Sequence, residues 1–301
     1  MAYLIFSASL LLIYVGLAQC LHVQFGMLGI PNFGVVGFWG LGMYGVGVLN
    51  VQLGVPFLIA LILACALVAV VAYGLGRLIL NLKGQDIVCA TLAFSAMVAL
   101  LVVTEKWMTE GVVGLGTIKY PFPLGKATEF FYFLLLVAVV VGLQYVINKL
   151  RESGLGRLMF AIRDNEELAA SLGKDSVGTK QVLFVITCTL MALLGGLSAP
   201  LNQFLTPNML VPGMTFAVWI GLILGGKENR LGALLGVFVT FGLFDILIET
   251  YVPVPPEYAM QVPNFKLFLY GAVLIAVLLF RPQGILSRNA KFGELLRRAG
   301  S

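Results

Sequence analysis

The sequence predicts an all-α polytopic integral membrane protein with about eight or nine transmembrane helices. Of its 301 residues, 60% are hydrophobic and only 11% are charged, whereas about a quarter of the residues in a soluble domain carry charge. Apolar runs long enough to cross a bilayer recur along the chain, and the run 58–75 contains no charged residue. These runs do not alternate between polar and apolar residues, which favours helices over a membrane β-barrel.

The apolar runs lie between charged or glycine- and proline-rich breaks, and they give the positions of the expected helices. We expect helices near residues 4–21, 33–49, 55–80, 86–104, 129–148, 181–199, 214–226, 231–250 and 266–280. The second of these segments is crowded with glycine, which favours close packing of its backbone on neighbouring helices over a broken helix that lines a cavity. The stretch 24–32 just before it contains Gly26, Gly29 and Pro31, and a re-entrant path stays open there.

The basic residues predict the orientation. If the carboxyl terminus is cytoplasmic, all of the 19 lysines and arginines fall on the cytoplasmic side except Lys106, Lys119, Lys126 and Lys266. This bias is the one that membrane insertion favours, and it places the amino terminus outside. The domain organisation follows as a transmembrane domain over residues 1–286, with a cytoplasmic insert at 149–180, and a basic cytoplasmic tail over 287–301.

The chemical motifs of soluble enzymes do not fit this chain. The segment 40–45 matches the GxGxxG dinucleotide fingerprint, but no strand precedes it. The segment 221–227 resembles a phosphate-binding loop, yet Glu228 replaces the hydroxyl residue that would bind magnesium. The single histidine, His22, has no partner in sequence, and the four cysteines lie singly in apolar stretches. We therefore expect no catalytic residue, no metal site and no bound cofactor in this chain.

The insert carries the clearest functional pattern. Leu158, Ile162, Ala169 and Leu172 recur at helical spacing, while acidic and basic residues occupy the complementary faces. Gly173 is well suited to end a helix. A helix that rests on the membrane surface usually carries mainly lysine and arginine on its polar face, so the mixed charge favours a helix that docks into a soluble partner subunit.

A family resemblance appears in the same insert. The run Glu167-Leu-Ala-Ala-Ser-Leu-Gly173 resembles the EAA loop of ABC-transporter permeases, the cytoplasmic coupling helix that seats in the ATPase subunit. The longer run from Gly156 to Gly173 is similar to the corresponding stretch of the LivM-type branched-chain amino acid permeases. Further similar segments follow in the same order along the chain, at 82–94, 221–232 and 279–286.

The resemblance implies a permease subunit of an ATP-driven importer in the bacterial cytoplasmic (inner) membrane. Its solutes would be branched-chain amino acids or relatives such as other amino acids, urea and short amides. Implied partners are a second homologous permease subunit, two ATP-binding cassette subunits that use ATP and Mg²⁺, and an extracytoplasmic solute-binding protein; nucleic acid is not among them. The residues expected to couple to the ATPase are Arg157, Arg163, Glu166, Glu167, Ala169, Ala170 and Gly173.

A path for a polar solute needs polar groups that face the interior of the bundle, because ionisable groups exposed to lipid are costly. Asp245 and Glu249 share one helix face, although solvation at the interface explains them slightly better. Gln19 and Asn32 are equally compatible with hydrogen bonds between helices. With Asn202, which follows the sixth expected helix, these residues are the candidates for the substrate path.

Other classes of membrane protein compete with this interpretation. An ion-coupled secondary transporter of a small polar solute would place ionisable residues at mid-membrane in internal repeats. A membrane-embedded enzyme would show a nucleophile, metal ligands or paired carboxylates at membrane depth. Neither pattern is clear in this sequence. An ABC permease for sugars differs mainly in its solute and stays open as an alternative.

Overall fold

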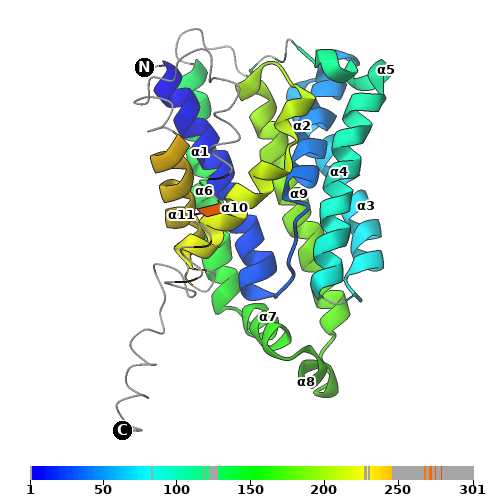
Figure 1. Ribbon diagram of the computed structural model, residues 1–301, viewed down its shortest axis with the longest axis vertical. Helices are drawn as coiled ribbons and strands as arrows, with labels where there is room; N and C mark the ends of the chain where they lie inside the picture. Colours follow the sequence, from blue (N-terminus) through cyan, green and yellow to red (C-terminus); the bar gives the residue numbers. More distant parts are fainter. Residues whose placement is uncertain are drawn as a thin grey trace. The chain divides into compact units, whose positions relative to one another are not determined.

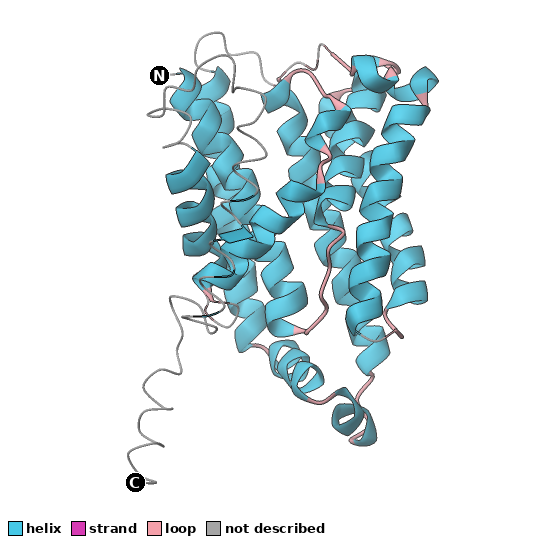
Figure 2. Ribbon diagram, in the orientation of Figure 1, coloured by secondary structure: helices cyan, strands magenta, loops and turns pink. Residues whose placement is uncertain are grey.

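A computed structural model describes residues 2–245 apart from 83, 117, 119, 122–127, 227, 228 and 230, together with the isolated positions 268, 271, 272, 275 and 279. The chain divides into two compact units, Met1–Phe216 and Ala217–Ser301. Figure 2 shows that regular structure within the described residues is helical. Among them, six helices are long and apolar enough to cross a membrane, which is the architecture of a multi-pass membrane protein.

Figure 1 gives the order of the elements. The first unit contains α1 (Ala2–Leu21), the π-helical segment η1 (His22–Met27), α2 (Val35–Val51), α3 (Phe57–Ile79), α4 (Gly84–Thr104), α5 (Lys106–Thr109), η2 (Gly111–Val113), α6 (Thr128–Glu152), α7 (Gly154–Asp164), α8 (Glu166–Ser171), α9 (Ser176–Asn202) and η4 (Pro207–Met209). Helix α10 (Pro212–Gly225) begins in this unit and ends in the second. The second unit continues with α11 (Gly232–Val237) and the π-helical segment η5 (Phe238–Asp245).

Helix α9 is the centre of the first unit, because it packs against α1, α2 and α3. Its contact with α2 is made backbone to backbone. A Cβ atom added to Gly42 of α2 would lie 2.0 Å from the carbonyl oxygen of Ala192, and one added to Gly195 of α9 would lie 2.0 Å from the carbonyl oxygen of Trp39. Only glycine permits this approach, so the close packing predicted for the glycine-rich segment is confirmed.

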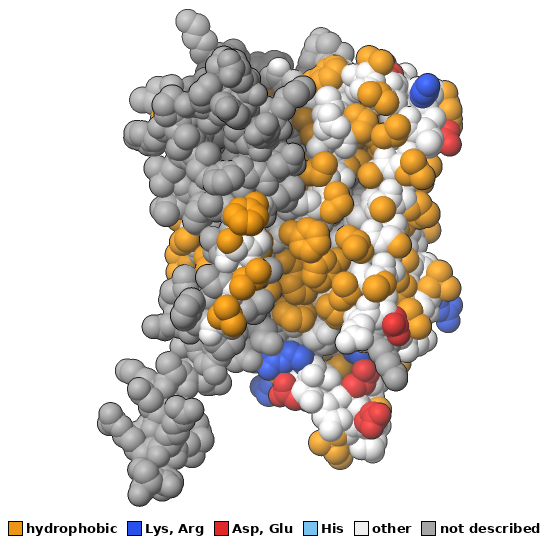
Figure 3. Space-filling view, in the orientation of Figure 1, with side chains coloured by type: hydrophobic (Ala, Val, Ile, Leu, Met, Phe, Trp, Pro, Cys, Tyr) orange, Lys and Arg blue, Asp and Glu red, His pale blue; other side chains and the backbone are white. Residues whose placement is uncertain are grey.

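The surface of the first unit matches a lipid environment. On the face shown in Figure 3, apolar side chains cover the middle of the bundle and the described acidic and basic side chains gather at its two ends. Large apolar side chains of α3 point outward, with Ile62 67% and Val70 73% exposed. We call the end that carries α7 and α8 the insert end, and the end that carries α5 and η2 the loop end (Figure 1).

The long helices lie within a few residues of the positions expected from the sequence. The expected helix near 266–280 falls mostly outside the described residues, as does the tail 287–301. The insert differs from expectation, because Asn165 adopts an extended backbone conformation (φ −158°, ψ 101°) and separates α7 from α8. The continuous apolar face predicted from Leu158 to Leu172 is therefore wrong: Ile162 and Ala169 are buried, but Leu172 is 71% exposed.

Candidate functional site

The insert is fixed to the bundle by short-range contacts at the insert end. Ser153 caps α7, since its hydroxyl oxygen accepts a hydrogen bond from the amide of Gly156 at 3.2 Å. A Cβ atom on Gly156 would lie 2.3 Å from the carbonyl oxygen of Leu150, so the end of α6 and the start of α7 are in direct backbone contact. The side chain of Asn165 then caps α8 by accepting from the amide of Leu168 at 3.0 Å.

The predicted coupling residues of α8 divide between its two faces. Ala169 is buried beneath the helix, whereas Glu167 and Ala170 are exposed. Glu166 forms an ion pair with Lys180 of α9, which ties the start of α8 to the long central helix. The outward face of α8 is therefore the accessible one.

Two of the other three predicted coupling residues, Arg157 and Gly173, lie on either side of α8 in the sequence. Arg157 is exposed on α7. Gly173 follows α8 with a φ of 75°, a left-handed conformation that glycine adopts without strain. The amide of Lys174 donates to the carbonyl oxygen of Ala169 at 3.2 Å, which closes the helix end.

Arg163 joins the insert to the chain that follows α1. Its Nη1 donates to the carbonyl oxygen of Gly26 at 2.6 Å, and its guanidinium lies 3.1 Å from the carboxylate of Asp164. The side chain is 22% exposed. Gly29, at a φ of 78°, would place a Cβ atom 3.0 Å from Cγ of Arg163, so this arginine packs closely against the turn after η1.

The segment after η1 runs uncoiled through the bundle as far as the start of α2 (Figure 2). A buried set of polar side chains holds it there. Gln24, which is 1% exposed, donates to the hydroxyl oxygen of Thr187 on α9 at 2.6 Å. Asn32, fully buried, donates to Oε1 of Gln24 at 2.9 Å and accepts from the amide of Gly34 at 2.7 Å. Asn32 therefore lies in the interior as predicted, but its amide is engaged in holding the chain.

Hydroxyl groups from α4 satisfy the backbone of the same segment. The amide of Phe33 donates to Thr91 Oγ1 at 3.0 Å, and the amide of Gly37, in the first turn of α2, donates to Ser95 Oγ at 3.1 Å. Non-helical backbone at membrane depth is tolerated only where protein groups or a cavity satisfy it. These contacts explain how α2 can begin inside the bundle.

The other predicted path residues have different surroundings. Gln19 is buried and donates to Oε1 of Gln144 on α6 at 2.9 Å, while its own Oε1 has no hydrogen-bond partner within the described part of the chain. Asp245 is the last residue of η5, and its side chain lies outside what the structure describes. Glu249 also lies outside the described residues.

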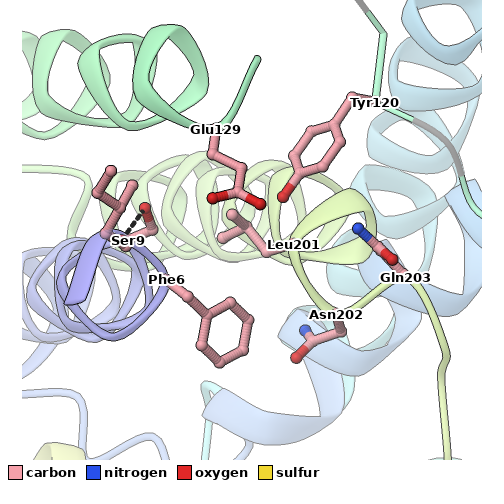
Figure 4. Close-up of a pocket in the computed structure, with 8 residues that line it drawn as sticks. Phe6, Ser9, Tyr120, Glu129, Leu201, Asn202 and Gln203 are labelled. Carbon is pink, nitrogen blue, oxygen red and sulfur yellow. Dashed lines mark hydrogen bonds between the residues drawn. The ribbon is translucent and has the colours of Figure 1, made fainter. Parts of the chain in front are cut away.

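Asn202 is the last residue of α9 and lies at the loop end. It lines two cavities. One cavity has a volume of about 320 Å³ and is lined by Ile5, Phe6, Ser9, Tyr120, Glu129, Leu201, Asn202 and Gln203 (Figure 4). The second, of about 230 Å³, adjoins Asn202 together with Trp39 and Asn208. The indole nitrogen of Trp39 is buried and has no hydrogen-bond partner among the residues described. The structure thus brings Asn202 to a polar opening in the bundle.

Comparison with known proteins decides the family. Residues 3–278 match the family described as "Branched-chain amino acid transport system / permease component". This chain belongs to that permease family. The permease is 26% identical to the high-affinity branched-chain amino acid transport system permease protein LivM of Salmonella typhimurium, and 26% identical to that of Escherichia coli, over 93% of this chain and 69% of each relative. It is 23% identical to a probable LivM permease of Methanocaldococcus jannaschii over 92% of both chains. No solved structure matches.

The family match confirms the resemblance to LivM-type permeases and does not favour an ion-coupled secondary transporter.

The sequence analysis missed several residues that lie in the polar interior or line the cavity at the loop end. Thr187 and Ser95 are single hydroxyl residues within apolar runs and carry no local signal. Glu129 and Gln203 could have been found, because Glu129 is an isolated carboxylate at the start of a transmembrane helix and Gln203 is adjacent to Asn202.

Proposed function

We propose that this permease forms the membrane path of an ATP-driven importer for branched-chain amino acids or related small polar solutes, with the α7–α8 insert as the contact for its ATPase subunits. The family match supports the class of protein. The names of its relatives support branched-chain amino acids as the solute. An ion-coupled transporter would need no coupling insert.

In this proposal the insert end faces the cytoplasm and the loop end faces outward, in the cytoplasmic membrane of a bacterium. The distribution of lysine and arginine supports this orientation. Most of the described basic residues lie in the insert or at the ends of α3 and α6 that are nearest to it. The amino terminus then lies outside, and the insert is accessible to soluble subunits.

The exposed surface of the insert suits a protein partner better than lipid. Leu155 is 55% exposed, Leu168 57% and Leu172 71%, and Glu167 is exposed beside them. Apolar side chains that are grouped with charges at a helical surface are typical of a protein interface. The charges also keep this surface out of the hydrocarbon core.

The observation that carries the proposal is the hydrogen bond from Arg163 to Gly26. It connects the insert directly to the segment whose Gln24 and Asn32 side chains lie in the interior of the bundle. A displacement of α7 by the ATPase subunits would therefore be transmitted to the uncoiled segment. We infer that this contact couples ATP hydrolysis to opening and closing of the path.

In this proposal, other subunits hydrolyse ATP and capture the solute. Two ATP-binding cassette subunits would bind ATP and Mg²⁺, a second homologous permease subunit would complete the path, and an extracytoplasmic binding protein would deliver the solute. This chain would bind no cofactor of its own.

Replacement of Glu167 by Lys, or of Gly173 by Val, tests the proposal in the full assembly. Glu167→Lys reverses a charge on the outward face of α8, and Gly173→Val imposes a β-branched residue at positive φ. We expect co-purification of the ATPase subunits and ATP-dependent uptake to fall by about tenfold or more. Glu110→Gln, an exposed carboxylate at the loop end, is the matched control and should leave both unchanged.

Two results would contradict the proposal. One is unchanged uptake and unchanged assembly in both insert variants. The other is uphill transport by vesicles that contain this chain alone and are energised by an ion gradient, which would favour a secondary transporter.

A further inference from the structure

The cavity at the loop end carries a single formal charge in its described lining. Its walls come from the first turns of α1, the start of α6, the end of α9 and the segment around Tyr120 (Figure 4). Glu129 supplies the charge, and it forms no ion pair with any residue that the structure describes. Within the described lining, no lysine or arginine balances it.

Two polar side chains of this lining already donate hydrogen bonds to backbone carbonyl oxygens. One N–H of Asn202 Nδ2 donates to the carbonyl oxygen of Ser198 at 2.9 Å, and the Oδ1 of this side chain can accept a hydrogen bond. The hydroxyl of Ser9 donates to the carbonyl oxygen of Ile5 at 2.7 Å, which leaves only lone pairs on that oxygen.

Tyr120 and Gln203 lie beside Glu129 in the same lining. Burial raises the pKa of the Tyr120 phenol, the negative charge of Glu129 raises it further, and a hydrogen bond with Gln203 lowers it. The side chain of Gln203 also carries a carbonyl oxygen that can accept a hydrogen bond. In Figure 4 the Glu129 carboxylate and the Tyr120 hydroxyl point toward one another.

The backbone around the cavity fixes these side chains in place. Gln203 has a φ of 57°, and its carbonyl oxygen accepts from the amide of Ile118 at 3.2 Å. Tyr120 packs edge to face on Tyr132, with ring centroids 5.2 Å apart, and Tyr132 is anchored by a 2.7 Å hydrogen bond from its hydroxyl to the carbonyl oxygen of Leu197. The acceptors are thus held by the ends of α6 and α9.

We propose that this cavity binds the primary ammonium group of the transported solute, with the Glu129 carboxylate as its counter-ion and the side-chain oxygens of Asn202 and Gln203 as further acceptors. An ammonium group presents three N–H donors and a positive charge, which complements a lining that has side-chain oxygens and one negative charge. Phe6 and Leu201 form apolar walls against which an aliphatic side chain can pack.

The inference rests on the proposed function and narrows its solute. Urea and short amides are neutral, so they form no ion pair with the carboxylate of Glu129. An amino acid does match through its ammonium group. Asn202 also lines the second cavity, which lies beside Trp39, so the two cavities share this residue.

The test is uptake of radiolabelled L-leucine into vesicles that contain the complete importer and its leucine-loaded binding protein. Glu129→Gln removes the charge with little change in shape, and we expect uptake to fall by roughly ten- to a hundredfold. Docking of the binding protein and co-purification of the ATPase subunits should not change. Glu110→Gln removes a carboxylate from the same end outside the cavity and should transport as the unmodified importer does.

A second variant separates a binding role from a structural one. The double substitution E129Q/Q203E moves the carboxylate across the cavity to a position where the hydroxyl of Tyr120 can donate to it. We expect this variant to regain at least about tenfold of the lost uptake. A merely structural role for Glu129 would not be rescued by a charge at another position.

The outcomes distinguish the inference from the proposed function. If the importer moves leucine and E129Q moves it equally well, the ammonium site is wrong while the proposed function stands. The site is also overturned if E129Q weakens docking of the binding protein, or if the double substitution restores nothing. If the unmodified importer moves urea or acetamide but no amino acid, the amino-acid solute and the ammonium site are both overturned.

Discussion

A methyl group at Gly195 would test how the centre of the bundle is held together. The Cβ atom of Gly195→Ala would meet the carbonyl oxygen of Trp39 at 2.0 Å and the amide nitrogen of Met43 at 3.1 Å. Both contacts are with the backbone of α2, so no side chain can rotate away. Ordinary contact begins at 3.4 Å, and α2 and α9 must therefore separate locally by about 1.4 Å.

The cost follows from the lost packing between these helices. Extra groups in a well-packed core usually cost about 1–3 kcal/mol, and a gap of roughly 0.5–1 Å already forfeits a quarter to a half of the dispersion attraction between facing atoms. The required movement is larger than that and affects the most extensive contact of α9. We therefore expect Gly195→Ala to lower the free energy of unfolding by about 3 kcal/mol, at the upper end of this range.

The assay is equilibrium unfolding of the purified permease in detergent micelles, followed by helical circular dichroism. Gly74→Ala is the matched control, because Gly74 lies within α3, is exposed, and has nothing within 4 Å of its added Cβ atom. It should be neutral or stabilising by up to about 1 kcal/mol. A Gly195→Ala protein as stable as the control would refute the direct backbone contact between α2 and α9.

Three further substitutions follow from the interior and the insert. Asn32→Leu should lower the free energy of unfolding by about 2 kcal/mol or more, because it leaves the amide of Gly34 buried without its acceptor; equal stability in chemical denaturation would contradict this. Arg163→Met keeps the apolar stem but removes the donor to Gly26, so ATPase subunits should still co-purify while uptake per ATP hydrolysed falls several-fold; an unchanged ratio of uptake to hydrolysis would argue against the coupling route. Leu172→Asp changes a side chain that is 71% exposed; the thermal midpoint should stay constant while ATPase binding weakens about tenfold, and a lowered midpoint would indicate a core position instead.

The transmembrane helices could be predicted because lipid imposes a simple length rule. Helix α3 illustrates this: its residues Phe57–Ile79 form one apolar run that ends where Arg77 approaches the membrane surface. Nothing about its neighbours was needed to find it. The same rule located α4, α6 and α9 to within a few residues.

The break in the insert shows where periodicity misleads. Leu158 and Leu172 match a single helical repeat, but Asn165 is a strong N-cap residue, and Glu166 and Glu167 after it are acidic residues suited to the first turn of a new helix. The local signal for two helices was therefore present. The hydrophobic repeat from Leu158 to Leu172 nevertheless predicted a single helix.

The polar interior could be predicted only in part, because it depends on residues far apart in the sequence. Gln24 and Asn32 stand out as polar groups near the end of an apolar run. Their partner Thr187 is 163 positions from Gln24 and looks like any threonine in a transmembrane helix. The sequence indicates that such amides need partners, but only the packing of α9 shows which partners they find. The roles of Asp245 and Glu249 remain predictions.

The α4 hydroxyl groups that accept hydrogen bonds from the backbone at the start of α2 also constrain the order in which the protein assembles. Phe33 and Gly37 leave the ribosome before Thr91 and Ser95, the α4 residues that accept their hydrogen bonds. Until α4 has been synthesised, this stretch cannot be stable within hydrocarbon, because its amides have no acceptors. The start of α2 therefore reaches its final depth only together with α4.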